Sequence, residues 1–269
     1  MNVLLFEDAQ VDQFQPITPG RPPHAMSCGA YRLVDLLVAG SIPVRSVVRS
    51  HLIDIQRADF PGLCEEFEQQ RKLLLLNSRT IPSASLVARI LHWAVETAEG
   101  VVRTQDAIAA AVLPEEKTSP ASKLNCDQLE DYFGFAGLAG APKATLEIPL
   151  FKWPHDVVRY HQSIFADNLA HRLQNGTYQE IADGVFAAGD AKLGQHVVTD
   201  SSAGTIVLEA GESIGRYTFL SGPAHIGARS RVLEHAAIKD GVALGHTTKI
   251  GREVEASIVE PYTNKQHHG

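Results

Sequence analysis

The fold is decided by residues 208–250, LEAGESIGRYTFLSGPAHIGARSRVLEHAAIKDGVALGHTTKI, in which an aliphatic side chain recurs at every sixth position. The series runs through eight hexads without a break: Leu208, Ile214, Leu220, Ile226, Val232, Ile238, Leu244 and Ile250. The residue four places after each is small or β-branched in seven of the eight cases. The exception is Glu212, and the other seven are Thr218, Ala224, Ser230, Ala236, Val242, Thr248 and Val254. Composition alone does not produce so regular a pattern.

A period of six predicts a prism with three faces, each face taking one hexad. The aliphatic side chain points inward, the smaller one packs beside it, and glycine lets the backbone turn at a corner. Three hexads make one coil, so this stretch predicts somewhat under three coils of a left-handed parallel β-helix, a rare exception to right-handed crossovers. The competing interpretation, a loop-rich β-sandwich, requires the spacing to be accidental.

Before residue 190 the pattern is that of an α/β domain. Short apolar runs predict buried strands, namely Asn2–Phe6, Leu73–Leu76, Val101–Thr104, Ala107–Val112 and Thr145–Phe151. A helix is predicted from Ala84 to Thr97, capped by Ser83, and its expected apolar face is Leu86, Ile90, Leu91 and Val95. A second helix is predicted after Pro154, ending at Asn175-Gly176, with an apolar face of Val158, Phe165, Leu169 and Leu173.

We therefore expect an α/β domain with a connecting helix over residues 1–190. A left-handed parallel β-helix of hexapeptide repeats, incomplete at its C-terminus, is expected over residues 191–269.

Composition argues against several classes of protein. The chain has 269 residues, 44% of them hydrophobic, and a net charge of −7, which argues against a nucleic-acid binder with a broad basic face. Apolar runs are too short to span a bilayer, and no signal peptide is recognised. The spacing of Cys28, Cys64 and Cys126 fits neither a disulfide framework nor a zinc site. A cytoplasmic protein without a membrane partner is expected.

Two stretches near the C-terminus carry a resemblance to a known family. Residues 249–258, KIGREVEASI, and 262–269, YTNKQHHG, resemble the K-I-G-G-E-V-x-x-S-I…Y-S-N-K-Q-H-x-G pattern of the bacterial and archaeal sugar nucleotidyltransferases, the group that includes the bifunctional UDP-N-acetylglucosamine pyrophosphorylase/glucosamine-1-phosphate N-acetyltransferases. This C-terminal block is the specific part of the resemblance.

Shorter matches lie in the N-terminal part. Phe6-Glu7-Asp8, Pro16-Ile17-Thr18, Arg21-Pro22 and Gly29 resemble the family's F-x-D…P-L-T-x-x-R-P…R-x-G. Residues 76–82, LNSRTIP, resemble its N-x-R-x-x-P, and residues 153–156, WPHD, resemble the P-W-D at a helix entry.

The resemblance implies that the α/β domain of residues 1–190 is nucleotidyltransferase-like. It also implies nucleotidylyl transfer: an oxygen of a sugar-1-phosphate attacks the α-phosphorus of a nucleoside triphosphate, and pyrophosphate leaves. It implies Mg²⁺ as cofactor and a UDP-N-acetylglucosamine-like product. Arg21 is the candidate catalytic residue, because a guanidinium group suits phosphate oxygens; the alternative is a solvated loop arginine. Asp8 is the candidate for Mg²⁺ or a base edge, and its alternative is a helix-cap or turn aspartate.

The remaining candidates for substrate binding are Asn77, Arg79, Lys265 and His267, all of which lie in the matched motifs. A paired histidine such as His267-His268 is more often simply exposed.

Departures from the family pattern favour a second hypothesis. The Gly-rich L-x-G-G-x-G-[ST]-R loop is absent, since residues 7–15 contain no glycine. Asn77-Ser78 stands where those enzymes have Gly-Asp, and Ser27 where they have a second arginine. Each change removes charge from the phosphate site. The second hypothesis is therefore a catalytically degenerate scaffold that binds a sugar nucleotide and assembles through its β-helix.

A third hypothesis is a hexapeptide-repeat acyltransferase. The family's G-H-S-Y and N-x-G-A-G-T segments are not found after N-K-Q-H-x-G, so acetyl transfer is not expected of this chain alone. His246 is a conceivable substitute base, although a histidine at a repeat corner is usually solvated. The last coil of the prism should need a cover. We therefore expect a homo-oligomer, a trimer first and a dimer second, with residues 256–269 poorly ordered or in the contact.

Overall fold

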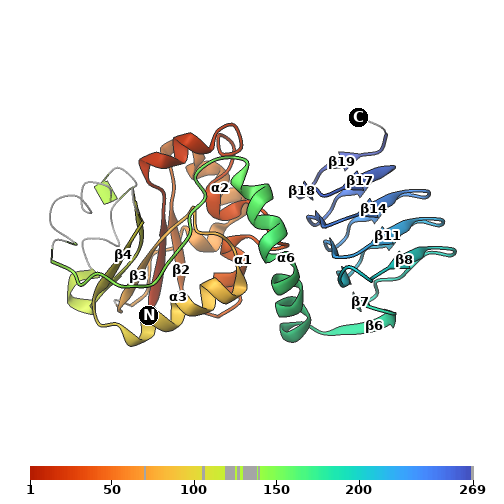
Figure 1. Ribbon diagram of the computed structural model, residues 1–269. Coiled ribbons are helices and arrows are strands. Elements are labelled where there is room, and N and C mark those ends of the chain that lie inside the picture. Colours follow the sequence, from red (N-terminus) through yellow and green to blue (C-terminus); the bar gives the residue numbers. More distant parts are fainter. Residues whose placement is uncertain are drawn as a thin grey trace. The chain divides into compact units, whose positions relative to one another are not determined.

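A computed structural model describes residues 1–69, 71–104, 107–118, 125, 128–129, 138 and 140–267 (Figure 1). The contacts divide the chain into two compact units. The first comprises Met1–Met26 and Arg32–Val157, and the second comprises Ser27–Tyr31 and Val158–Gly269. A short turn from the N-terminal part of the sequence is thus grouped with the C-terminal unit. The domain division at residue 190 stays a prediction.

The first unit is built on a five-stranded sheet in the order β2-β1-β3-β5-β4. Strand β1 pairs in parallel with β2 and with β3, whereas β5 runs antiparallel to both β3 and β4. Every residue of β1, β3 and β5 is buried, as expected for central strands covered on both faces. Their bounds are β1 Asn2–Phe6, β2 Val44–Val47, β3 Leu73–Asn77, β4 Gly100–Arg103 and β5 Ile108–Leu113.

Short helices surround this sheet. Helix α3 (Ala84–Glu96) begins where predicted, and the Ser83 hydroxyl accepts a hydrogen bond from the Leu86 N–H. Val95 was wrongly placed on its apolar face, since it is 58% exposed and Ala94 is buried instead. The other described helices are α1 Leu33–Val38, α2 Ile53–Asp59, and the 3₁₀ segments η1 Ala9–Phe14, η2 Pro23–Ala25, η3 Ser50–Leu52, η4 Pro61–Leu63 and η5 Glu115–Lys117.

The strand predicted over Thr145–Phe151 is wrong. The segment is extended, but only an isolated bridge between Thr80 and Leu150 joins it to a neighbour. Pro149 has no N–H to donate to a strand partner. Its carbonyl accepts from the Ile81 N–H, and Phe151 N donates to Arg79 O. The segment therefore runs along the end of β3 without joining the sheet.

The second unit contains the predicted left-handed parallel β-helix, with three parallel sheets and about four coils in place of under three. All eight aliphatic side chains of the hexad series are inside, between 0 and 4% exposed, which confirms the prediction. The strands are β8 Val198–Asp200, β9 Ile206–Leu208, β10 Ser213–Ile214, β11 Phe219–Ser221, β12 Ala224–Ile226, β13 Arg231–Val232, β14 Ala237–Lys239, β15 Val242–Leu244, β16 Lys249–Ile250, β17 Glu253–Glu255, β18 Ile258–Val259 and β19 Asn264–Lys265.

Differences in coil length explain why the β-helix has more coils than the hexad series predicts. In the middle coils residues three hexads apart are paired, for example Ile206 with Ala224. In the first coil Val198 pairs with Phe219, an interval longer by three residues. In the last coil Ala243 pairs with Ile258, an interval shorter by three. A search for a strict period of six residues therefore misses the first and the last coil of the β-helix.

A hairpin, β6 (Tyr178–Ala182) and β7 (Val185–Ala188), joins the sheet that also contains β9. It is preceded by helix α6 (Asp156–Asn175), whose Phe165 and Leu169 pack with Val207 and Ala243 of the β-helix. Val158 was wrongly assigned to the apolar face of α6, because it is 51% exposed.

A part-buried carboxylate links this helix to the coils. Glu209 Oε1 accepts from Arg172 Nη1 at 2.8 Å, from Tyr178 Oη at 2.9 Å and lies 3.1 Å from His225 Nε2. Burial would raise the pKa of Glu209, but the hydrogen bonds and the neighbouring Arg172 charge lower it to about 2. Within the described residues, no helix has the length and hydropathy needed to cross a membrane.

We predict that Ile226→Ala destabilises the protein by about 2–5 kcal/mol, the cost of a cavity in a packed interior. Ile226 is fully buried, whereas Val198, on β8 of the same β-helix, is 60% exposed. The matched variant Val198→Ala should change stability by less than about 0.5 kcal/mol. Urea unfolding of both variants measures the difference, and equal effects would refute the inward placement of the series.

Candidate functional site

The described polar side chains of interest in the first unit meet at the carboxyl ends of β1 and β3. Strand β1 lies between β2 and β3. The chain after β1 forms β2 on one side of it and then β3 on the other side, so the strand order reverses at β1. Ligands of open α/β sheets bind at such switch points, outside the carboxyl ends of the strands. Phe6 pairs with Asn77, which brings Asp8 and Arg79 together just beyond the strands.

Asp8, Asn77 and Arg79 form one hydrogen-bonded cluster. The Asp8 carboxylate accepts from Arg79 Nε at 2.9 Å, from Arg79 Nη2 at 2.6 Å and from Asn77 Nδ2 at 2.8 Å. The Arg79 side chain is 1% exposed and that of Asp8 is 15% exposed. Arg79 Nη1 also donates to Phe151 O at 2.6 Å, and Asn77 Oδ1 accepts from Arg79 N at 3.0 Å. The three predicted residues are therefore brought together, with Asp8 the most accessible.

A second ion pair lies at the same edge. Glu7 Oε2 accepts from the backbone N–H of Arg49 at 2.8 Å and from Arg49 Nε at 3.0 Å. Arg49 Nη2 also donates to Thr18 O at 2.8 Å, which ties the loop after β1 to the end of β2. Burial raises the pKa of Glu7, and Arg49 acts against that rise. Arg49 was missed in the sequence, where nothing distinguished the residues that follow β2.

The loop between β1 and Arg21 takes a form that matches its lack of glycine. Residues Ala9–Phe14 form η1, with Asp8 at its N-cap position. Arg21 follows, partly exposed, next to Gly20, around whose Cβ position there is open space. Thus the backbone after β1 does not form a glycine cradle for phosphate. The role predicted for Arg21 stays a prediction.

Ser27 belongs to the second unit. Its N–H and its hydroxyl donate to the two carboxylate oxygens of Glu260, at 3.0 and 2.9 Å. His161 Nδ1 accepts from the Gly29 N–H at 2.9 Å in the same turn. This turn is held by residues far along the sequence, a role that the local pattern around Ser27 did not indicate.

The two C-terminal candidates lie in the last coil. Lys265 Nζ donates to the carbonyls of Gly251, Glu253 and His267, at 3.4, 3.3 and 3.3 Å. Its ammonium group thus caps carbonyls at the end of the prism, which is an alternative to substrate binding. Residues 256–267 carry the paired strands β18 and β19, so the structure does not show the poorly ordered alternative there. His268 and Gly269 lie outside the described residues.

The remaining candidates for catalysis are a histidine and the thiols. His246 faces the ring edge of Tyr262, with centroids 4.9 Å apart, and its Nδ1 lies 3.3 Å from the hydroxyl of Thr247. Cys28 and Cys64 are free thiols. Burial raises the pKa of Cys28, which disfavours a thiolate nucleophile. Cys126 lies outside the described residues.

Across the described ranges, no three His, Cys, Asp or Glu side chains gather into a metal site. The Asp8 carboxylate already accepts three hydrogen bonds, and an ionised carboxylate offers about four lone-pair positions. Mg²⁺ is commonly held by one or two carboxylates together with substrate phosphates. The residues therefore fit an ion that arrives with a nucleotide, with Asp8 as its protein ligand.

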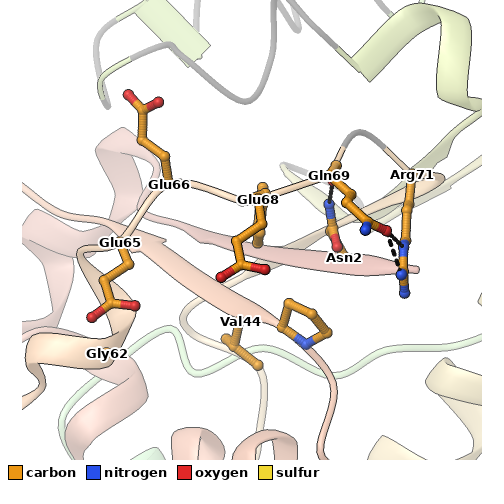
Figure 2. A pocket seen from close by; sticks show the side chains of 10 residues that line it. Asn2, Val44, Gly62, Glu65, Glu66, Glu68, Gln69 and Arg71 are labelled. Atoms are coloured by element: carbon orange, nitrogen blue, oxygen red, sulfur yellow. Dashed lines mark hydrogen bonds between the residues drawn. The ribbon is translucent and has the colours of Figure 1, made fainter.

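A pocket of about 290 Å³ lies at the opposite, amino edge of the sheet, near Asn2 and Val44 (Figure 2). Three glutamates line it. Figure 2 shows the Glu66 side chain pointing away from Val44, and those of Glu65 and Glu68 pointing to the side on which Val44 lies. Arg71 contributes one positive charge, and its guanidinium donates to Gln69 Oε1. Three carboxylates repel phosphate groups, so this pocket is unsuited to an anionic substrate.

Comparison with protein families gives a match that covers more than half of the chain. The sequence model of the sugar nucleotidyl transferases matches residues 3–175, from β1 to the end of α6. The chain belongs to the sugar nucleotidyl transferase family. A comparison with curated proteins gave no match.

Membership in the sugar nucleotidyl transferase family implies a nucleotide and a sugar phosphate as substrates. The matched range contains the Asp8–Asn77–Arg79 cluster, Arg21 and Arg49, and ends before the first coil of the β-helix. The family finding therefore directs attention to the first unit and to the carboxyl edge of its sheet.

We predict that Arg79→Ala destabilises this sugar nucleotidyl transferase by about 3–5 kcal/mol, because it leaves a part-buried carboxylate unpaired. The control is Arg57→Ala, which breaks a pair with Asp54 whose side chains are 65% and 93% exposed. It should cost less than about 1 kcal/mol. Urea unfolding at fixed salt measures both, and an equally small effect of the two variants would show that the buried pair does not hold the edge together.

Proposed function

We propose that the protein is a sugar-1-phosphate nucleotidylyltransferase that joins a nucleoside triphosphate to a sugar-1-phosphate and releases pyrophosphate. The observation that carries the proposal is the polar cluster of Asp8, Asn77 and Arg79 at the switch point between β1 and β3. A UDP-N-acetylglucosamine-like product is the specific form suggested by the resemblance at the C-terminal block. We place the reaction in the cytoplasm.

The protein's part in such a reaction is to position two phosphates and to balance their charge. Arg79 and Asn77 fix the orientation of the Asp8 carboxylate, which keeps accessible surface facing the edge. Arg21 would bind phosphate oxygens of the triphosphate through its guanidinium group. Lys265 and His267 remain candidates for sugar phosphate binding. No residue has to form a covalent bond, because the sugar phosphate oxygen is itself the nucleophile.

Mg²⁺ enters this proposal bound to the triphosphate. When bound it neutralises charge on the phosphates and so assists departure of pyrophosphate. Asp8 is the residue that would contact it. Asp8 also holds Arg79, so the carboxylate stays oriented whether or not the ion is there.

Two observations favour the second candidate function, a scaffold that binds a sugar nucleotide without converting it. The guanidinium of Arg79 already donates hydrogen bonds to Asp8 and to the Phe151 carbonyl, so few of its donors remain for a substrate. The short helix η1 replaces a phosphate-cradling loop. In that case the chain binds a nucleotide but releases no pyrophosphate.

A pyrophosphate-release assay across nucleoside triphosphates and sugar-1-phosphates, with Mg²⁺ present, separates the two functions. We expect release that requires both substrates. Nucleotide binding without release under all combinations would favour the scaffold, and absence of nucleotide binding would contradict both.

We predict that Arg21→Ala weakens triphosphate binding by about 1.5–3 kcal/mol, the range for a hydrogen bond to a charged group. Arg103 is an exposed arginine of β4 in the same unit, and Arg103→Ala should leave the dissociation constant unchanged. Calorimetry at fixed salt provides the measurement. If both variants bind as the wild type does, Arg21 is a solvated loop arginine.

We predict a homo-oligomer, a trimer first and a dimer second, because β17 and β18 each have a strand partner on one side only, and edge strands favour pairing with another chain. Light scattering at micromolar concentration measures the mass. A monomer would mean that caps such as the Lys265 ammonium are enough to cover this end.

A further inference from the structure

One inward position of the β-helix carries a carboxyl group where the coils that follow carry hydroxyl groups. The register aligns Ser213, Arg231 and Lys249, so the residues before them, Glu212, Ser230 and Thr248, form one column. In the later coils the hydroxyls satisfy one another. Thr248 Oγ1 donates to Ser230 Oγ at 3.0 Å, and Ser230 Oγ donates to Gly245 O at 2.9 Å.

Glu212 is only half satisfied in this column. It is 6% exposed. Its Oε1 accepts from the backbone N–H of Lys192 at 3.1 Å, and its Oε2 has no hydrogen-bond partner among the described residues. Burying an ionised oxygen without a partner is costly, whereas a protonated carboxyl is neutral and can donate. The site therefore favours the protonated form.

The charged groups around Glu212 add to this preference. Asp190 lies nearby, and its Oδ1 accepts from the Gly211 N–H at 2.8 Å. The side chain of Lys192 is exposed, and Arg229 packs against Gly211. Burial first, and then the charge of Asp190, raises the pKa of Glu212 to about 7, against the hydrogen bond from Lys192. Stability linked to this group is fully present below about pH 4.5, the ordinary pKa of the carboxyl group, and is lost as pH rises from there to about 7.

The segment that contacts Glu212 covers the start of the prism. Ala191 and Leu193 pack on the core of the β-helix. A Cβ on Gly194 would lie 2.5 Å from the Ile214 carbonyl oxygen, so the chain passes close against β10, the edge strand of its sheet. Two side-chain contacts hold this segment, Lys192 N to Glu212 and Gly211 N to Asp190, beside a backbone hydrogen bond from Tyr217 N to Gln195 O at 3.3 Å. The two side-chain contacts depend on carboxyl groups that repel each other when ionised.

We propose that residues 189–195 form a proton-controlled cap on the first coil of the β-helix. The cap is closed while Glu212 is protonated. Ionisation of Glu212 places an unpartnered charge inside the prism beside Asp190, and the cap opens to let water reach that charge. The edge strand β10 and the interior behind Leu193 are then exposed.

Amide hydrogen exchange of the full chain, followed by mass spectrometry, tests the proposal. Wild type and Glu212→Gln are compared at the same pH, so that the intrinsic exchange rate cancels. At about pH 8, peptides covering 189–195 should exchange at least about tenfold faster in the wild type, because the pKa of Glu212 is about 7 in the closed cap and ordinary once water reaches the carboxyl. At about pH 4, below the ordinary pKa of a carboxyl group, the two proteins should differ little.

Glu234→Gln is the matched control, because Glu234 is an exposed carboxylate of the following coil, and it should behave as the wild type at both pH values. Asp190→Asn keeps an acceptor for Gly211 and removes the repelling charge, so its exchange at about pH 8 should fall between wild type and Glu212→Gln. Equal protection of wild type and Glu212→Gln at about pH 8 would overturn the proposal. If Glu212→Gln does not fold, an Asp190→Asn protein indistinguishable from wild type overturns it.

Discussion

The guanidinium group of Arg79 is buried at the carboxyl edge of the sheet, and the arrangement of that edge follows from the need to pair it. A buried cation requires both a counter-charge and hydrogen-bond acceptors. Asp8 supplies the charge, and the Phe151 carbonyl supplies a further acceptor. The pair thereby joins the ends of β1 and β3 and holds the extended segment before α6 beside them. The one carboxylate with accessible surface in this cluster, Asp8, is fixed in orientation by the same contacts.

The pairing bears on both proposed functions. An enzyme gains from it because Asp8 is presented in a fixed orientation at the switch point, where a nucleotide would bind. A scaffold is favoured by it because the charge of Arg79 is already neutralised. Membership in the sugar nucleotidyl transferase family covers both cases, since fold and family do not by themselves establish turnover. Arg49 is paired with Glu7 in the same way, so Arg21 is the arginine that we propose for binding the triphosphate at this edge.

The sequence predicted the β-helix well because each of its hexads repeats the same inward contact. It predicted β1 and β3 because their leucine-rich runs are buried on both faces. It failed where the contact is not local. Thr145–Phe151 reads as a strand, yet Pro149 and the end of β3 keep it out of the sheet. The first and last coils were missed because the first is longer and the last is shorter than three hexads, and a strict count of six does not detect such insertions and deletions.

The site was predictable in part for the same reason. Asp8, Asn77 and Arg79 were found because they follow buried strands and lie in recognisable motifs. Their mutual pairing was not predictable, because it depends on the register of Phe6 with Asn77. Arg49 was not singled out, since a lone charge next to a short strand has no distinctive pattern. Glu212 was visible only as the one member of its hexad position that is neither small nor β-branched, and no function was assigned to it. Their importance comes from burial and from partners distant in sequence.

The central claim is that nucleotide binds at the carboxyl edge of the sheet. Photo-crosslinking with an azido-substituted nucleoside triphosphate, followed by peptide mapping, tests it most directly. Labelled peptides should come from the loop after β1, which contains Asp8 and Arg21, and from the segment after β3, which contains Arg79. Unlabelled triphosphate in excess should abolish the label. Competable labelling confined to the amino-edge pocket, around Glu65 and Glu68, would contradict the claim.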